Sequence, residues 1–228
     1  MKLAHATLHM IIDWPENAVP VLTIEAPRQF RTLASELLRQ CEGADGGFVL
    51  SESWEPLDIA RICGIITDPL RLEFNGRQAA TALTKWLKAE AMSERFHLQT
   101  QEAKQTLLQW FATIANESDE PLAWNDDLDT AQLLKAFNAH FEDEECTLPE
   151  KLLRYIRIAQ SYLNQNCFFF IHLKQYLSKV ELQTFYKDVL YRKVRILLLE
   201  NIYTQPIAGY ETSWVVDLDD CEIHPDDI

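Results

Sequence analysis

Consecutive apolar residues mark two parts of the chain, and a region with helical spacing separates them. The first part, residues 1–74, carries the short β-rich runs LHMII, VLTIE, GFVL, GIITD and LRLEF, with one helix expected over PRQFRTLASELLRQC. The second part, residues 167–228, carries CFFFIHL, VRILLLE and SWVVDL. Turn residues separate these runs, which is typical of an α/β domain.

The region between them, residues 75–166, contains helical patterns and almost no β signal. It begins with GRQAATALTKWLKAEAMSERF and ends with DTAQLLKAFNAHF and LPEKLLRYIRIAQSYL, and the acidic loop ANESDEPLAWND interrupts it. Because the chain supplies strands on both sides, we expect this region to be a helical leg. The leg would be inserted into one α/β head made of residues 1–74 and 167–228.

A strand–helix–strand unit is expected within the second part. FFFIHL is apolar at consecutive positions, as in a parallel strand that is covered on both faces. Ser178 offers a helix N-cap, and Glu181 three residues later completes a capping box. The chain then returns as VRILLLE, which makes a right-handed βαβ crossover. Ligands of α/β folds bind at the carboxyl ends of such strands, so His172 and Glu200 are the positions that an enzyme would use.

The sequence lacks the motifs that normally supply chemistry at that edge. A phosphate loop needs glycines followed by Lys and Ser or Thr, but the one glycine cluster, GADGGF, precedes no such pair. The six histidines show no metal-ligand spacing, and no GxSxG motif occurs. The sequence therefore favours a protein that is not an enzyme.

The composition and net charge exclude further classes of protein. The formal net charge of −14 excludes a uniformly basic surface for nucleic acid. The five cysteines form no CxxC pair, and the start of the chain lacks a basic segment followed by an apolar core, so we expect a reduced, cytoplasmic protein. No apolar run approaches the roughly 20 residues that a membrane helix requires.

The order of motifs resembles a known family, the small ring-forming adaptation protein of type II-A CRISPR systems. The motifs that carry this resemblance are VLTIEAPRQFRTLASELL, GGFVLSE, IITDPLRLEFNGRQAATALTKWL, DDLDTAQLLKAFNAHFEDE, IHLKQYLSKVELQTFYKDVLYRKVRILLLENI and DLDDCEI. They span nearly the whole chain. The resemblance implies an ABC-ATPase-like head with a mostly parallel sheet and no working nucleotide site, together with an inserted helical leg.

The resemblance also implies a function. It indicates a homotetrameric ring that threads linear double-stranded DNA, binds near its ends and carries calcium. The ring would support spacer acquisition beside the CRISPR integrase and the guide-RNA nuclease, without catalysis of its own.

An acidic ring can hold DNA only if its cations are segregated along the hole. The candidate cations lie on helices of the leg and in the segment YRKVR: Lys135, Lys151, Arg154, Arg157, Arg192, Lys193 and Arg195. Three of them, Lys151, Arg154 and Arg157, repeat at helical spacing and form one basic stripe. The alternative is that these groups are ordinary solvated faces.

Two acidic clusters offer the hard oxygen ligands that calcium prefers. The candidates are Asp126, Asp127 and Asp129 in NDDLD, and Glu142, Glu144 and Glu145 in FEDEE. Neither cluster is an EF-hand. If LLKAFNAHF is a helix, the clusters lie at its opposite ends, about 20 Å apart, so each needs other partners or holds its own ion. The alternative for the aspartates is that they complement the dipole of that helix.

Two other classes of function remain open. A degenerate nucleotide hydrolase would bind ATP or GTP near His172 and Glu200. A protein-interaction scaffold would bind no DNA, and the acidic tail DLDDCEIHPDDI favours it.

Overall fold

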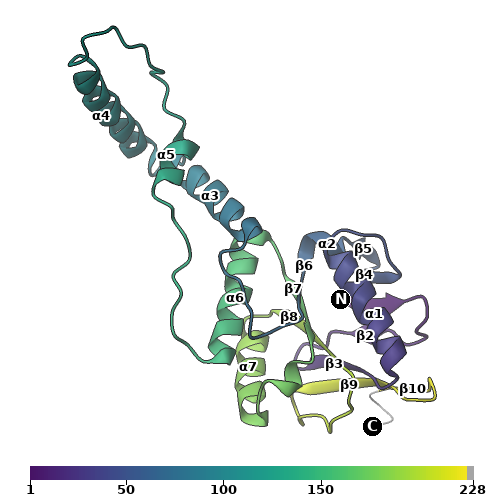
Figure 1. Ribbon diagram of the computed structural model, residues 1–228. Helices are drawn as coiled ribbons and strands as arrows, with labels where there is room; N and C mark the ends of the chain where they lie inside the picture. The colour runs from purple at the N-terminus through teal and green to yellow at the C-terminus, as the bar shows by residue number, and fades with distance from the viewer. Residues whose placement is uncertain (225–228) are drawn as a thin grey trace. The chain divides into compact units, whose positions relative to one another are not determined.

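The computed structural model describes residues 1–224. Contacts divide the chain into two compact units. The first unit joins residues 1–73 to the chain from Glu144 onward, and the inserted unit is Phe74–Asp143. The fold is a mixed α/β fold, as predicted, in which strands before and after the insertion share one sheet (Figure 1).

The main sheet of the first unit has six strands in the order β10-β9-β3-β8-β7-β6. Five strands are mutually parallel, and only β10 runs antiparallel to its neighbour. The predicted neighbours CFFFI and RILLLE are adjacent parallel strands, and RILLLE also pairs with the N-terminal strand VPVLTI, which confirms the mostly parallel sheet. The bounds are β3 (Val19–Ile24), β6 (Cys63–Ile66), β7 (Cys167–Ile171), β8 (Arg195–Glu200), β9 (Glu211–Val216) and β10 (Glu222–Ile223).

Apolar clusters cover both faces of this sheet, which explains the consecutive apolar runs. Phe169 of β7 belongs to a cluster with Leu33 and Leu37 of α1 (Pro27–Cys41). Phe168 and Phe170 belong to the opposite cluster, with side chains of α6 (Leu148–Leu163) and α7 (Lys179–Tyr191). The sheet therefore separates α1 from the layer formed by α6 and α7.

Local sequence signals place α7 as predicted. The Ser178 hydroxyl accepts a hydrogen bond from the backbone N–H of Glu181, and the Glu181 carboxylate accepts one from the backbone N–H of Ser178 at 2.8 Å. The Ser178 hydroxyl also donates to this carboxylate at 2.7 Å, and this bond, followed by the one from the backbone N–H, lowers the pKa of Glu181. The short 3₁₀ helix η1 (Leu173–Gln175) carries the chain from β7 toward this cap.

A smaller antiparallel sheet of the first unit has the order β2-β1-β4-β5. Its strands are β1 (Lys2–His5), β2 (Ile12–Asp13), β4 (Phe48–Glu52) and β5 (Glu55–Leu57), and the short helix α2 (Ile59–Ile62) follows. Apolar side chains of this sheet and of α1 belong to one buried cluster. The expected run LHMII forms a strand only at its end, because β2 begins at Ile12.

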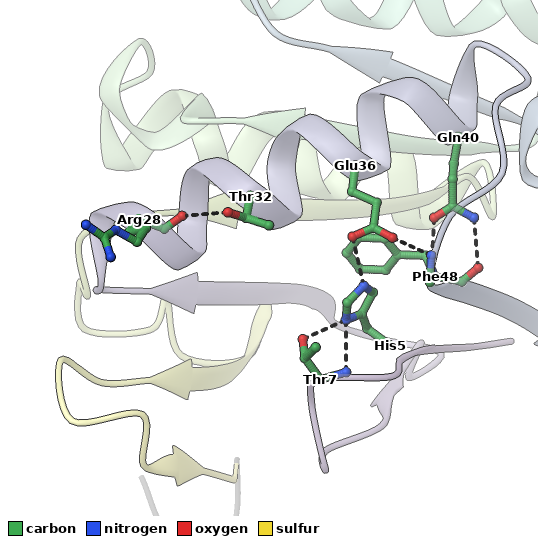
Figure 2. A network of polar contacts seen from close by, with 8 residues as sticks. His5, Thr7, Arg28, Thr32, Glu36, Gln40 and Phe48 are labelled. Atoms are coloured by element: carbon green, nitrogen blue, oxygen red, sulfur yellow. Dashed lines mark hydrogen bonds and ion pairs between the residues drawn. The ribbon is translucent and has the colours of Figure 1, made fainter.

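Polar contacts fix α1 to this smaller sheet, as Figure 2 shows. The ring nitrogen Nε2 of His5 lies 3.2 Å from a carboxylate oxygen of Glu36. The other oxygen of Glu36 accepts the backbone N–H of Gly47, and this bond is the main cause of the lowered pKa of Glu36. One turn later, the Gln40 amide accepts from and donates to the backbone of Phe48, at 2.9 and 3.0 Å. These contacts hold one side of α1 to β1 and β4.

The inserted unit contains α3 (Arg77–Ala91), α4 (His97–Ala115) and α5 (Thr130–Ala136). Helices α3 and α5 pack together. The two ends of the unit are joined by a pair of hydrogen bonds. The Asn75 side chain donates to the carbonyl of Phe141 at 2.9 Å and accepts the N–H of Phe141 at 2.8 Å.

Two boundaries differ from the sequence prediction. Residues 144–166, assigned there to the leg, belong to the first unit, because α6 buries Leu152 and Ile156 in the core of that unit. The run LRLEF, expected as a strand, is irregular. The turn before it is closed by Asp68, whose side chain accepts the N–H of Leu70 at 3.0 Å. An Asx turn at an Asp-Pro pair competes with strand formation, and here it prevails.

Candidate nucleic-acid interface

The first basic segment lies on α6. This helix buries Leu152 and Ile156 against the sheet, so residues on its other side face away from the core. Arg157 is exposed and Lys151 is half-buried. The three-residue spacing of the predicted stripe therefore places cations along the outer side of α6.

The middle residue of the stripe is engaged by an acid. A guanidinium nitrogen of Arg154 lies 3.7 Å from a carboxylate oxygen of Glu144, and the Arg154 side chain is only 15% exposed. A predicted DNA contact and a predicted calcium ligand thus form one ion pair. This contact leaves Lys151 and Arg157 as the more accessible cations of the helix.

The second basic segment lies where α7 ends and β8 begins. Arg192 is the C-cap of α7, and Lys193 follows it in the left-handed conformation with φ of 55°. Arg195 forms an ion pair with Glu52 of β4. A cleft of about 350 Å³ lies beside this segment, and its lining includes Trp14, Lys193 and Arg195.

The two basic segments belong to the same layer of the first unit. Helices α6 and α7 pack together and share one apolar cluster on the same face of the main sheet. The remaining predicted cation, Lys135, is exposed in the last turn of α5, in the inserted unit. Six of the seven candidate cations are therefore carried by the first unit.

The predicted aspartates lie at the start of α5, as the alternative interpretation expected. Asp129 is the N-cap, and its carboxylate accepts the N–H of Ala131 at 3.1 Å and lies 3.8 Å from the ammonium of Lys88. Asp127 lies 3.4 Å from the ammonium of Lys104 on α4. Asp126 is exposed in the preceding loop. These contacts link α5 and its loop to α3 and α4.

The predicted glutamates lie in the irregular segment before α6, where Glu142, Glu144 and Glu145 are all exposed. The helix expected to separate them from the aspartates is shorter than predicted, because α5 ends at Ala136. Within residues 1–224, no group of three or more His, Cys, Asp or Glu side chains is arranged to hold a metal ion.

The carboxyl edge of the main sheet brings His172 and Glu200 together. His172 follows β7 in the left-handed conformation, and its Nδ1 lies 3.9 Å from a carboxylate oxygen of Glu200. The His172 ring stacks on Phe30 of α1 at a centroid distance of 4.7 Å. Burial lowers the pKa of His172 and raises the pKa of Glu200 to about 7. Burial thus favours the neutral imidazole of His172, and Glu200 is about half protonated near neutral pH.

A buried polar network beside this edge was missed by the sequence analysis. The side chain of Glu211, at the start of β9, has no solvent exposure and lies 2.8 Å from the ammonium of Lys174. The Tyr186 hydroxyl donates to the same carboxylate at 2.8 Å. The sequence offers little signal for this network, because a glutamate in the first position of a strand is usually exposed to solvent.

The junction between β3 and α1 is where a phosphate loop would stand in an α/β nucleotide-binding fold. Here the connection is only Glu25 and Ala26, and Pro27 occupies the first turn of the helix. Proline has no N–H to offer a phosphate, and the carboxylate of Glu25 carries the wrong charge. This junction does not supply phosphate-binding chemistry.

The fold thus defines a mixed α/β protein with a helical insertion and two basic segments on one layer of its first unit. A family model described as CRISPR-associated protein (Cas_Csn2) matches residues 40–220, which is more than half of the chain. The chain belongs to this family, the type II-A CRISPR-associated proteins that its motif order resembles. A search of curated proteins finds no match. Among residues 1–224, no helix is long and apolar enough to cross a membrane.

Proposed function

We propose that this chain assembles as a homotetrameric ring that binds the ends of linear double-stranded DNA and supports spacer acquisition in type II-A CRISPR immunity. Membership of the CRISPR-associated family supports the role in defence. The observation that carries DNA binding is the placement of two basic segments, on α6 and after α7, in one layer of the first unit. The protein acts in the cytoplasm, where its partners are the CRISPR integrase and the guide-RNA nuclease.

Segregation of charge reconciles this proposal with an acidic chain. Four copies carry four times the net charge of −14, so DNA can be held only where cations outnumber acids locally. Lys151 and Arg157 on α6, and Arg192 and Lys193 after α7, are exposed or half-buried and can reach phosphates. Contacts to phosphate carry no sequence information, which suits a ring that must accept any duplex.

We propose further that the head is an ABC-ATPase-like domain that has lost its nucleotide chemistry. The short junction between β3 and α1, with Glu25 and Pro27 in place of a glycine-rich loop, supports this proposal. The protein then acts by binding alone and catalyses no reaction.

Calcium is proposed as the cofactor, with the aspartates and glutamates described above as its ligands. The arrangement of the described residues does not hold calcium without change. Asp127 would have to exchange Lys104 for the ion, and Glu144 would have to exchange Arg154. Calcium binding would therefore compete with the ion pairs of these carboxylates.

The decisive experiment is a mobility-shift assay that compares linear with closed circular duplex, with and without calcium. The linear form should bind and the closed circle should not, because a closed ring loads by threading over an end. Affinity should fall steeply as salt rises, by roughly one power of the salt concentration for each phosphate contact. Equal binding of both forms, or binding of neither, would show that the proposed function is wrong.

A charge-reversal pair tests which surface meets the duplex. The variant Lys151→Glu/Arg157→Glu should weaken binding by more than about tenfold and reduce the salt dependence, because each chain loses two phosphate contacts. The matched control is Arg28→Glu/Arg31→Glu, which makes the same charge change on exposed residues of α1, across the main sheet from α6. If both variants bind alike, α6 does not carry the DNA contacts.

A further inference from the structure

The hairpin between β4 and β5 presents an aromatic side chain on a strained backbone. Glu52 pairs with Glu55, so Ser53 and Trp54 alone form the connection. Both have positive φ, 52° and 70°, as in the type I′ turn of two-residue hairpins. That turn favours Asn and Gly, and a bulky residue in the left-handed region is an outlier. Trp54 therefore adopts backbone angles that are unfavourable for a bulky side chain.

The Trp54 side chain gains little from burial in return. It is 94% exposed, the most exposed of the large apolar side chains among residues 1–224. Its one aromatic or cationic contact in this described part is with Lys2, whose ammonium lies 5.9 Å from the ring centroid. A strained conformation that is not repaid by packing points to a role outside the chain.

The tip is nevertheless held in place, which suits a binding anchor. The ion pair between Arg195 and Glu52 ties the end of β4 to the first residue of β8. Lys2, which lies over the Trp54 ring, is itself 3.4 Å from the carboxylate of Asp13. A side chain that is already positioned loses less conformational entropy when it binds. Tryptophan is also one of the residues most enriched among energetic anchors of protein interfaces.

We propose that Trp54 is the anchor by which this protein docks on a basic protein partner, inserting its ring into an apolar pocket with Lys or Arg at the rim. The charge of the tip and of the whole chain indicates which kind of partner would bind. Arg195 and Lys2 pair with Glu52 and Asp13, so Glu55 is the acid beside the tip that has no ion pair among residues 1–224. This unpaired acid and the net charge of −14 favour a cationic protein surface as the partner. Pro56 on the edge strand β5 cannot donate a ladder hydrogen bond, which disfavours docking by strand addition.

This inference rests on the proposed function for the choice of partner. Proteins that process nucleic acid carry basic surfaces, so the partner is a DNA-handling member of the same adaptation machinery. The probes are the purified integrase and guide-RNA nuclease from the same CRISPR system.

The test replaces the tip by the pair that a type I′ turn prefers, Ser53→Asn/Trp54→Gly. The melting temperature should stay equal or rise, because the strain is relieved. The shift of linear duplex should not change, whereas affinity for at least one protein probe, measured by interferometry, should fall by more than about tenfold. Trp54→Tyr should retain part of the affinity. Trp110→Ala, which removes another exposed tryptophan on α4, should retain all of it.

Three results would overturn the inference. A lower melting temperature of the Asn–Gly variant would show that the tip is not strained. If this variant bound both probes with wild-type affinity, or if the wild type bound neither probe, Trp54 would not be the anchor. Loss of the DNA shift or of ring assembly in this variant would make Trp54 a contact to nucleic acid or to another copy. The proposed function is judged separately, by whether the wild-type chain binds linear duplex.

Discussion

Removal of the Glu211 carboxylate should destabilise the first unit strongly. Its side chain is fully buried at the start of β9 and accepts three hydrogen bonds. The Tyr186 hydroxyl donates to one oxygen at 2.8 Å, while the Lys174 ammonium, at 2.8 Å, and the N–H of Ile207, at 2.9 Å, donate to the other. Glu211→Ala would leave all three donors without this acceptor.

The largest loss comes from Lys174, whose side chain is only 9% exposed. Removing one partner of a buried ion pair costs about 3–5 kcal/mol, because the other charge stays buried and uncompensated. For a unit of this size, 1 kcal/mol shifts the melting temperature by about 2–4 °C. We therefore expect Glu211→Ala to lower the melting temperature by roughly 6–20 °C.

Urea unfolding followed by far-ultraviolet circular dichroism measures this loss. Two matched variants separate the charge from the hydrogen bonds. Tyr186→Phe removes one bond to a charged acceptor and should cost about 1.5–3 kcal/mol. Lys174→Met/Glu211→Leu removes both charges and should recover much of the loss seen in Glu211→Ala. A cost below about 1 kcal/mol for Glu211→Ala would refute the reasoning, because the site would then be open to water.

Three further predictions follow from single sites. Because burial raises the pKa of Glu200 from 4.5 to about 7, the folded state holds a proton that the unfolded chain releases, so stability should fall as pH rises through this range. Glu200→Gln should abolish this fall, about 3 kcal/mol between pH 4 and 8, in urea titrations at both values. Ser178→Ala should cost about 1 kcal/mol by removing the N-cap of α7, and Ser178→Gly less, by the same titration. Calcium should raise the melting temperature, and changing Glu142, Glu144 and Glu145 to Gln should reduce that rise, whereas an unchanged rise would place the ion elsewhere.

The strand–helix–strand stretch was predictable because its signals are local. A short run of consecutive apolar residues is typical of a strand that is covered on both faces, and β7 and β8 are buried along nearly their whole length. The capping box at Ser178 fixes where α7 starts regardless of tertiary context. The meeting of His172 and Glu200 also followed from the sequence, since parallel strands end at one edge.

Other features depended on partners distant in sequence and could not be predicted. The cationic stripe on α6 was visible as a spacing, but the ion pair between Arg154 and Glu144 depends on how the segment before the helix folds back. The same holds for Arg195, whose partner Glu52 lies 143 residues earlier. The end of the leg was misplaced for a similar reason. Helical spacing identifies α6 as a helix, but only its packing assigns it to the first unit.

The paired hydrogen bonds between Asn75 and Phe141 join the two ends of the inserted unit, so the chain enters and leaves this unit at neighbouring points. Without them, pairing β6 with β7 requires the closure of a loop of 100 residues between Ile66 and Cys167, and such long-range pairing slows folding. Closing the inserted unit at its base by these bonds would shorten the chain that must be searched when the two strands pair. The entropic cost of closing a loop grows only slowly with its length. Inserted units of different size could therefore replace this one at little cost to the stability of the sheet. Evolution can therefore lengthen or replace the insertion while the strands on either side keep their register.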